Sequence, residues 1–136
     1  MPTTSARTKN SVTIQYAVPR RGVPGPASFR RWARGNVVIR IVGAREGRQL
    51  NQLFRKKDKA TNVLTFHTGD IVLCHPVIVR EARAQGKSLT AHYAHLVVHG
   101  LLHLRGYDHE KKREAARMER EEIRILRRLG FADPYG

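Results

Sequence analysis

The sequence predicts an α+β domain in which a small mixed sheet of about four strands packs against about five helices. Three observations predict this class. The first half of the chain holds short segments rich in β-branched residues, two of these segments are close enough to form a hairpin, and the second half has the pattern of consecutive helices. The 136 residues suffice for one hydrophobic core, so we expect a loose tail over residues 1–10 and a single domain over residues 11–136.

Four segments have the pattern of strands. Val12–Tyr16 alternates apolar and polar residues, and Val37–Val42 is rich in β-branched residues. The other two, Asn62–Phe66 and Ile71–Cys74, are separated by turn-forming residues at Thr68–Asp70. This arrangement predicts a hairpin between them.

Two helices are expected between these strands. The first is short, with Ser28 as its N-cap and with Phe29 and Trp32 on its buried side. The second covers residues 44–57 and has an amphipathic pattern. Its predicted buried residues are Leu50, Leu53 and Phe54.

The second half of the chain predicts three more helices. The first of them ends at Gly86, and Ser88 is the expected N-cap of the next. That next helix is apolar on almost all sides, so we expect it to pass through the middle of the domain. The last helix covers about residues 110–129 and ends at Gly130. Its predicted buried residues are Ala115, Met118, Ile123, Ile125 and Leu126.

Three histidines around the end of the central helix predict a metal site. His99, His103 and His109 stand at offsets of zero, four and ten, with Gly106 between the second and the third. On a helix, the first two lie about one turn apart and can face one ion. Gly106 can adopt the left-handed conformation that ends a helix, and this turn can bring His109 back toward the other two.

This ligand set indicates one catalytic zinc ion per chain. Three imidazoles that leave a fourth position to water are typical of catalytic zinc, whereas structural zinc usually has four protein ligands with thiolates among them. Cys74 is the only cysteine, which excludes a thiolate-rich site. A single histidine is more often a hydrogen-bonded core residue than a ligand. We expect His95, one turn before His99, to lie in the wall of the pocket.

The charge of the chain favours a polyanionic partner. Lys and Arg number 26 against 11 Asp and Glu, the formal net charge is +15, and no acidic residue precedes Glu46. Nucleic acid is the leading partner, although an arginine-rich proteome would also give a basic chain. A lone cysteine fits the reducing cytoplasm. No segment approaches the ~18 apolar residues of a membrane span, so we expect no membrane partner.

The chemistry that fits this site is phosphodiester cleavage. Zinc proteases carry a glutamate directly after their first histidine as general base, whereas here that position is Gly100, which argues against a peptidase. Phosphoryl transfer needs a cation aimed at the transition state, and Arg55 is the candidate. By position alone, a solvated cation at a helix end is the more common role for such an arginine. Asp108 is a candidate to orient a ligating imidazole, and it is also a common turn residue.

Three blocks of the sequence together resemble the YbeY family of metal-dependent endoribonucleases. They are Asn51–Leu64, Gly69–Ile71 and His99–His109, and the resemblance covers roughly residues 35–130. It departs from the family between Phe66 and Gly69, where only two residues replace a stretch that is commonly longer, often acidic and proline-bearing. We expect a different cleft rim there.

The resemblance implies a function and the residues that carry it. His99, His103 and His109 would bind zinc, Arg55 would be the functional cation in the cleft, and Lys57 would join it in contacting RNA. The substrate would be single-stranded RNA, with a role in ribosomal RNA maturation, including the 3′ end of 16S rRNA, and in quality control of ribosomes and their small subunit.

Two other functions stay open at the level of sequence. The chain could be a ribosome-associated RNA-binding assembly factor whose zinc is mainly structural, or, with less support, a metallopeptidase. The residues also leave open whether water or the ribose 2′-hydroxyl of the RNA attacks the phosphorus. They do not decide which metal the imidazoles bind in the cell, because several transition metals suit this ligand set.

Overall fold

The computed structural model describes residues 11–55, 61–108 and 110–136, and it confirms the α+β class with a four-stranded mixed sheet and five helices in these ranges. The predicted tail, residues 1–10, lies outside the described residues. In chain order the elements are β1 (Val12–Tyr16), α1 (Pro26–Trp32), β2 (Val37–Val42), α2 (Ala44–Arg55), β3 (Val63–Phe66), β4 (Asp70–Cys74), α3 (His75–Gln85), α4 (Leu89–Leu104) and α5 (Lys112–Arg128).

The sheet has the strand order β1-β2-β4-β3. Strands β1, β2 and β4 are parallel, and β3 pairs antiparallel with β4 as the predicted hairpin. The hairpin turn contains Gly69 at φ 92°, where an added Cβ would lie 3.0 Å from the carbonyl oxygen of Asn36. This strained and crowded position favours glycine. Because β3 is the last strand in this order, it forms one edge of the sheet.

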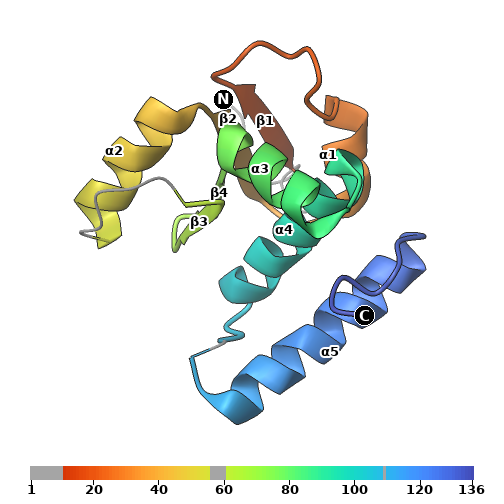
Figure 1. Ribbon diagram of the computed structural model, residues 1–136. Coiled ribbons are helices and arrows are strands. Elements are labelled where there is room, and N and C mark those ends of the chain that lie inside the picture. The colour runs from red at the N-terminus through yellow and green to blue at the C-terminus, as the bar shows by residue number, and fades with distance from the viewer. Residues whose placement is uncertain (1–10, 56–60, 109) are drawn as a thin grey trace.

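Helix α4 occupies the middle of the domain, as predicted. It contacts α1, α3 and α5 as well as β3 and β4, and Figure 1 shows it between the sheet and α5. Tyr93, Ala94 and Val97 on this helix are fully buried. Gly100 faces the sheet, because a Cβ there would lie 3.2 Å from side-chain atoms of Ile71. A glycine after His99 thus also has a packing reason.

The ends of the helices in the second half follow the predicted signals. Helix α3 stops at Gly86, whose φ of 65° is left-handed. Ser88 caps α4 by accepting a hydrogen bond from the backbone N–H of Ala91 at 3.1 Å. Within the described ranges, none of the helices is long and apolar enough to span a membrane.

Two expectations for the first half are wrong. The N-cap of α1 is Gly25 rather than Ser28, because Pro26 takes the first helical position, where its missing N–H costs nothing. On α2, Leu53 and Phe54 are 72% and 62% exposed rather than buried. The main contacts of α2 are with β4 and α3, and Figure 1 shows the helix standing away from the sheet. In its last turn, the ring of Phe54 packs edge-on against Phe66 of the edge strand β3, at 5.0 Å between centroids.

Candidate metal centre

Helix α4 brings His99 and His103 to the same cavity. The two residues are one helical turn apart, and their rings lie 4.7 Å apart between centroids with planes at 80°. Both line a cavity of about 490 Å³ beside the edge strand β3. The predicted convergence of these two imidazoles is therefore observed.

The chain turns back at the end of α4 as Gly106 predicts. Gly106 has φ 97°, and the N–H of Tyr107 donates to the carbonyl of Leu102 at 3.0 Å, which is the pattern that closes a helix through a left-handed residue. The turn brings Asp108 to the same cavity. His109, the predicted third ligand, lies outside the described residues.

The described part of the chain contains no group of three His, Cys, Asp or Glu arranged to hold a metal. His109, which would complete such a group, is not among these residues. His99 and His103 are the two predicted ligands that the structure describes.

A buried carboxylate fixes the orientation of His99. Glu122 on α5 is completely buried, and its Oε2 lies 2.5 Å from Nδ1 of His99. A metal-binding histidine almost always donates its second ring N–H to a carboxylate, a carbonyl or water, which fixes the tautomer. With its proton on Nδ1, His99 carries the lone pair on Nε2, the nitrogen that would coordinate a metal. The residues present thus fit a zinc ion.

Glu122 is the centre of a buried hydrogen-bond network. Its Oε1 lies 3.0 Å from Nε2 of His95 and accepts a hydrogen bond from the hydroxyl of Tyr135. Burial acts to raise the pKa of Glu122, but the hydrogen bonds from His95, His99 and Tyr135, with the charge of His99, outweigh it and lower the pKa to about 2. The carboxylate is therefore ionised at neutral pH and acts only as an acceptor.

The cation predicted from the sequence faces the same cavity. Arg55, the last residue of α2, lines it together with His99 and His103. Lys57 lies outside the described residues. The other lining residues are Thr61, Asn62, Val63, Thr65, Asp108 and Glu110. The described cavity wall therefore combines two imidazoles, one guanidinium, two carboxylates and several neutral groups.

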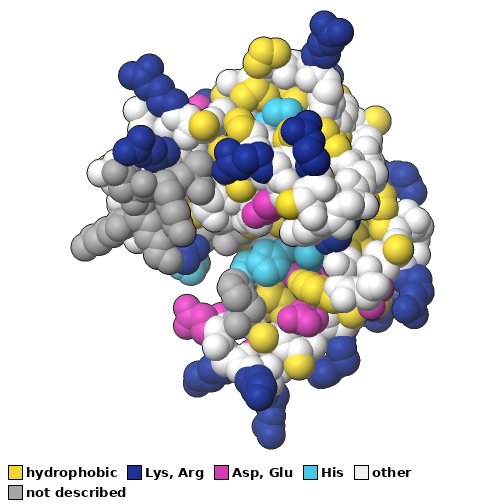
Figure 2. All heavy atoms as spheres, viewed as in Figure 1, with side chains coloured by type: hydrophobic (Ala, Val, Ile, Leu, Met, Phe, Trp, Pro, Cys, Tyr) yellow, Lys and Arg dark blue, Asp and Glu magenta, His cyan; other side chains and the backbone are white. Residues whose placement is uncertain are grey.

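A second cavity adjoins the first at His99. It has a volume of about 790 Å³ and shares Asn62, Val63 and His99 with the first cavity. His95 lines it, as expected for a residue of the pocket wall. On the visible face in Figure 2, histidine side chains gather at the hollow above α5.

Comparison with known proteins shows the family of the chain. The family model described as "Endoribonuclease YbeY" matches residues 26–130. The chain belongs to this family. An endoribonuclease YbeY of Stenotrophomonas maltophilia is 48% identical, with 91% of this chain and 92% of the relative covered. One of Nitrosomonas eutropha is 51% identical, with 91% and 97% covered. A solution structure of a Thermotoga maritima protein, 25% identical, covers 91% of this chain and 98% of its own with a TM-score of 0.49.

This YbeY-family chain is shorter than some of its relatives. The alignment with the Stenotrophomonas protein spans 148 positions, more than the 136 residues of the chain, so that the relative has residues without a counterpart here. In this chain β3 and β4 are joined by a tight turn, in which the N–H of Gly69 donates to the carbonyl of Phe66 at 2.9 Å. That the missing residues belong to this turn stays a prediction.

Two residues of the site were not identified from the sequence. Glu122 and Tyr135 lie 23 and 36 residues after His99, so no local spacing links them to the histidines. One signal was present, because Met118, Glu122 and Leu126 recur at intervals of four and share the buried face of α5. A glutamate on an apolar helix face indicates a buried partner. Asp108 accepts a hydrogen bond from the backbone N–H of Glu110 at 3.1 Å, and its predicted role in orienting an imidazole stays a prediction.

Proposed function

We propose that this member of the YbeY family is a zinc-dependent endoribonuclease that cleaves single-stranded RNA in the cavity lined by Arg55, His99 and His103. The observation that carries the proposal is the bond between His99 and the fully buried Glu122, which prepares one ring nitrogen for a metal at a cavity that also holds a guanidinium. His95 also bonds to Glu122, but it does so through Nε2, whereas His99 uses Nδ1 and shares its cavity with His103.

The proposed zinc ligands are His99, His103 and His109. When bound, zinc would act as a Lewis acid toward a phosphoryl oxygen and would lower the pKa of a water molecule. Glu122 holds His99 in the ligating tautomer, and the turn at Gly106 returns the chain toward the cavity. The metal's identity rests on this donor set, which contains imidazoles and no thiolate.

Arg55 is the proposed partner of the phosphate. Its guanidinium offers a planar fork of donors that matches two phosphoryl oxygens, and this fork favours the charge that develops during phosphoryl transfer. Asp108 and Glu110 bring carboxylates to the same cavity, and they are the groups placed there to accept a proton. Lys57 remains a proposed second contact to RNA.

The proposed substrate is ribosomal RNA, and the proposed role is maturation of the 3′ end of 16S rRNA and quality control of the small ribosomal subunit in the cytoplasm. Membership in the family and the net charge of +15 support an RNA substrate. The cavity beside an edge strand is reached more easily by a single strand than by a rigid duplex, which supports the preference for single-stranded RNA.

Substitution of one ligand tests the catalytic proposal. We expect His103→Ala to lose zinc and to reduce cleavage of a 5′-labelled single-stranded RNA by at least ~100-fold. Removal of a residue that merely orients a zinc ligand already lowers metal affinity or activity by up to about 100-fold, and His103 is a proposed ligand itself. His67→Ala is the matched control, since His67 is exposed and lies outside both histidine cavities. Zinc content by elemental analysis and cleavage by gel are the measurements. Undiminished cleavage by His103→Ala would refute the proposal.

Zinc removal and the Arg55→Ala variant distinguish the enzyme from an RNA-binding assembly factor with a structural zinc. For the assembly factor, zinc removal unfolds the domain, and Arg55→Ala leaves the activity of the protein in ribosome assembly unchanged. For the enzyme, Arg55→Ala lowers cleavage while the fold and the zinc content are kept. Circular dichroism of the zinc-free wild type, together with RNA cleavage by folded, zinc-loaded Arg55→Ala, decides between the two.

A further inference from the structure

A third cavity lies where three helices end. It has a volume of about 390 Å³, and its lining residues come from the last turns of α1, α4 and α5 and the residues just after them. It shares no described lining residue with the two histidine cavities. Five arginines form its rim: Arg31, Arg34, Arg105, Arg124 and Arg128. No acidic side chain is among the described residues that line it. We refer to it as the arginine pocket.

The floor of the arginine pocket is apolar and contains an unpaired hydrogen-bond donor. Trp32 and Leu102 on the floor are 4% and 1% exposed. The indole N–H of Trp32 is buried and has no hydrogen-bond partner in the part of the chain that the structure describes. Buried donors are nearly always paired. The N–H lies below the surface of the pocket, so the arginines of the rim are the polar groups that a ligand would reach.

Stabilisation of helix ends explains only part of the arginine rim. Cations are favoured at helix C-termini, and Arg31 does donate to the carbonyl of Leu129 at 2.8 Å. Arg124 pairs with Glu121 at 2.7 Å. Within residues 11–55, 61–108 and 110–136, no hydrogen bond or ion pair holds the other three guanidiniums, which belong to Arg34, Arg105 and Arg128. Among the described residues of the pocket lining, no acidic side chain offsets the repulsion between these guanidiniums.

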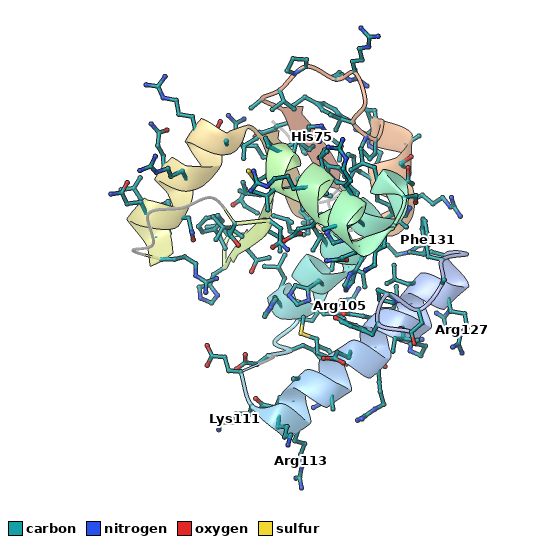
Figure 3. All side chains as sticks on the ribbon, in the orientation of Figure 1. His75, Arg105, Lys111, Arg113, Arg127 and Phe131 are labelled. Carbon is teal, nitrogen blue, oxygen red and sulfur yellow. The ribbon has the colours of Figure 1, made fainter. Side chains whose placement is uncertain are left out.

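We propose that the arginine pocket binds phosphate groups of RNA at a second site, away from the metal centre. The proposal rests on the proposed RNA substrate. Guanidinium forks match phosphate oxygens in pairs. Figure 3 labels Arg105 at the C-terminal end of α4, the helix that also carries the metal-site histidines. RNA cleaved at the metal centre would thus be held by flanking phosphates on another face of the same helix.

A neighbouring pair of arginines tests the proposal. Arg128 lines the pocket, whereas Arg127 does not, and both are exposed residues in the last turn of α5. Single-stranded DNA presents the same kind of phosphates and is not cut by an endoribonuclease, so its binding can be measured by fluorescence anisotropy without any cleavage. We expect Arg128→Gln to weaken binding about 3- to 10-fold and to reduce the salt slope by ~0.7 for each lost phosphate contact. Arg127→Gln should change the affinity less than about twofold.

The outcomes separate this site from the proposed enzyme function. Equal effects of Arg127→Gln and Arg128→Gln would overturn the pocket and leave only general charge, whatever the cleavage assay shows. Loss of cleavage in His103→Ala with retained DNA binding would support both proposals. In the RNA cleavage assay, Arg128→Gln should raise KM and leave kcat unchanged, and a lowered kcat with unchanged KM would contradict a distant phosphate site.

A competition experiment identifies the source of the phosphate. Inorganic phosphate and adenosine 5′-monophosphate are titrated into the wild type and into Arg34→Gln, which removes a second arginine of the rim. Sub-millimolar binding of the nucleotide that depends on Arg34, with oligonucleotide binding unchanged by that substitution, would assign the pocket to a free nucleotide and overturn the RNA proposal. Polyglutamate that competes as well as the oligonucleotide at equal charge would overturn phosphate recognition.

Discussion

At the scale of single residues, the site depends on a glutamate that has no motif of its own. The sequence pattern predicted that His99 and His103 would share a cavity, because a spacing of four is a property of one helix. It could not predict Glu122, because that contact joins α4 to α5 and depends on how the two helices pack. Local spacing therefore predicted the two imidazoles at one cavity, and tertiary packing supplied the carboxylate that orients His99.

Glu122→Gln tests this orienting role. The amide keeps the size of the side chain but removes the charge that fixes the proton on Nδ1 of His99, so we expect zinc affinity to fall about 10- to 100-fold. Competition with a chromophoric chelator measures the change. Glu121→Gln is the matched control, since that carboxylate is more exposed and pairs with Arg124. Equal zinc affinity in the wild type and Glu122→Gln would contradict the assignment.

At the scale of elements, local signals predicted boundaries better than burial. Val12–Tyr16 and Val37–Val42 are strands with the expected bounds, and α4 begins at Ser88 and ends before Gly106 as expected. Caps and turns depend on neighbouring residues, which a sequence displays. The burial of Phe54 was predicted wrongly because an amphipathic pattern shows which face is apolar, and tertiary packing decides how much of that face is covered.

Substitution of two glycines that end helices distinguishes the effect of a turn on protein stability from its effect on the metal site. Gly106 has φ 97° and Gly130 has φ 94°, and an added Cβ at either meets no atom within 4 Å. Alanine at either position should lower the free energy of unfolding by ~1–2 kcal/mol, the cost of a left-handed backbone for an L residue. Urea unfolding of the zinc-free proteins measures this cost.

Zinc affinity then distinguishes the two variants. Only Gly106→Ala disturbs the turn that leads from His103 toward His109, so we expect weaker zinc binding in this variant and unchanged binding in Gly130→Ala. A similar loss of zinc affinity in both would show that the effect follows from stability alone, and it would count against the turn as part of the metal centre.

At the scale of the whole molecule, the proposed cleavage site and the proposed second phosphate-binding site are separate cavities. The histidine cavities are both lined by residues of α4 and β3, and the arginine pocket lies where α1, α4 and α5 end. The net charge of +15 indicated a polyanionic partner, but it does not show where on the surface that partner binds. The placement of five arginines around one cavity follows from helix packing, and the sequence alone did not show it.

Removal of zinc from the whole protein should separate these two activities. A chelator should abolish RNA cleavage and lower the melting temperature, because metal that binds only the folded state stabilises it. Binding of single-stranded DNA below the melting temperature should change less than about threefold, because the arginine pocket does not use the metal. Simultaneous loss of cleavage and DNA binding in folded, zinc-free protein would refute the separation.

X-ray absorption at the zinc edge of the purified protein tests the metal centre most directly. The account predicts one zinc ion per chain with three imidazole nitrogens and one oxygen at about 2.0 Å, and loss of one imidazole in a His99→Ala variant that still binds the metal. A sulfur shell, four protein imidazoles, or a spectrum that His99→Ala leaves unchanged would contradict it.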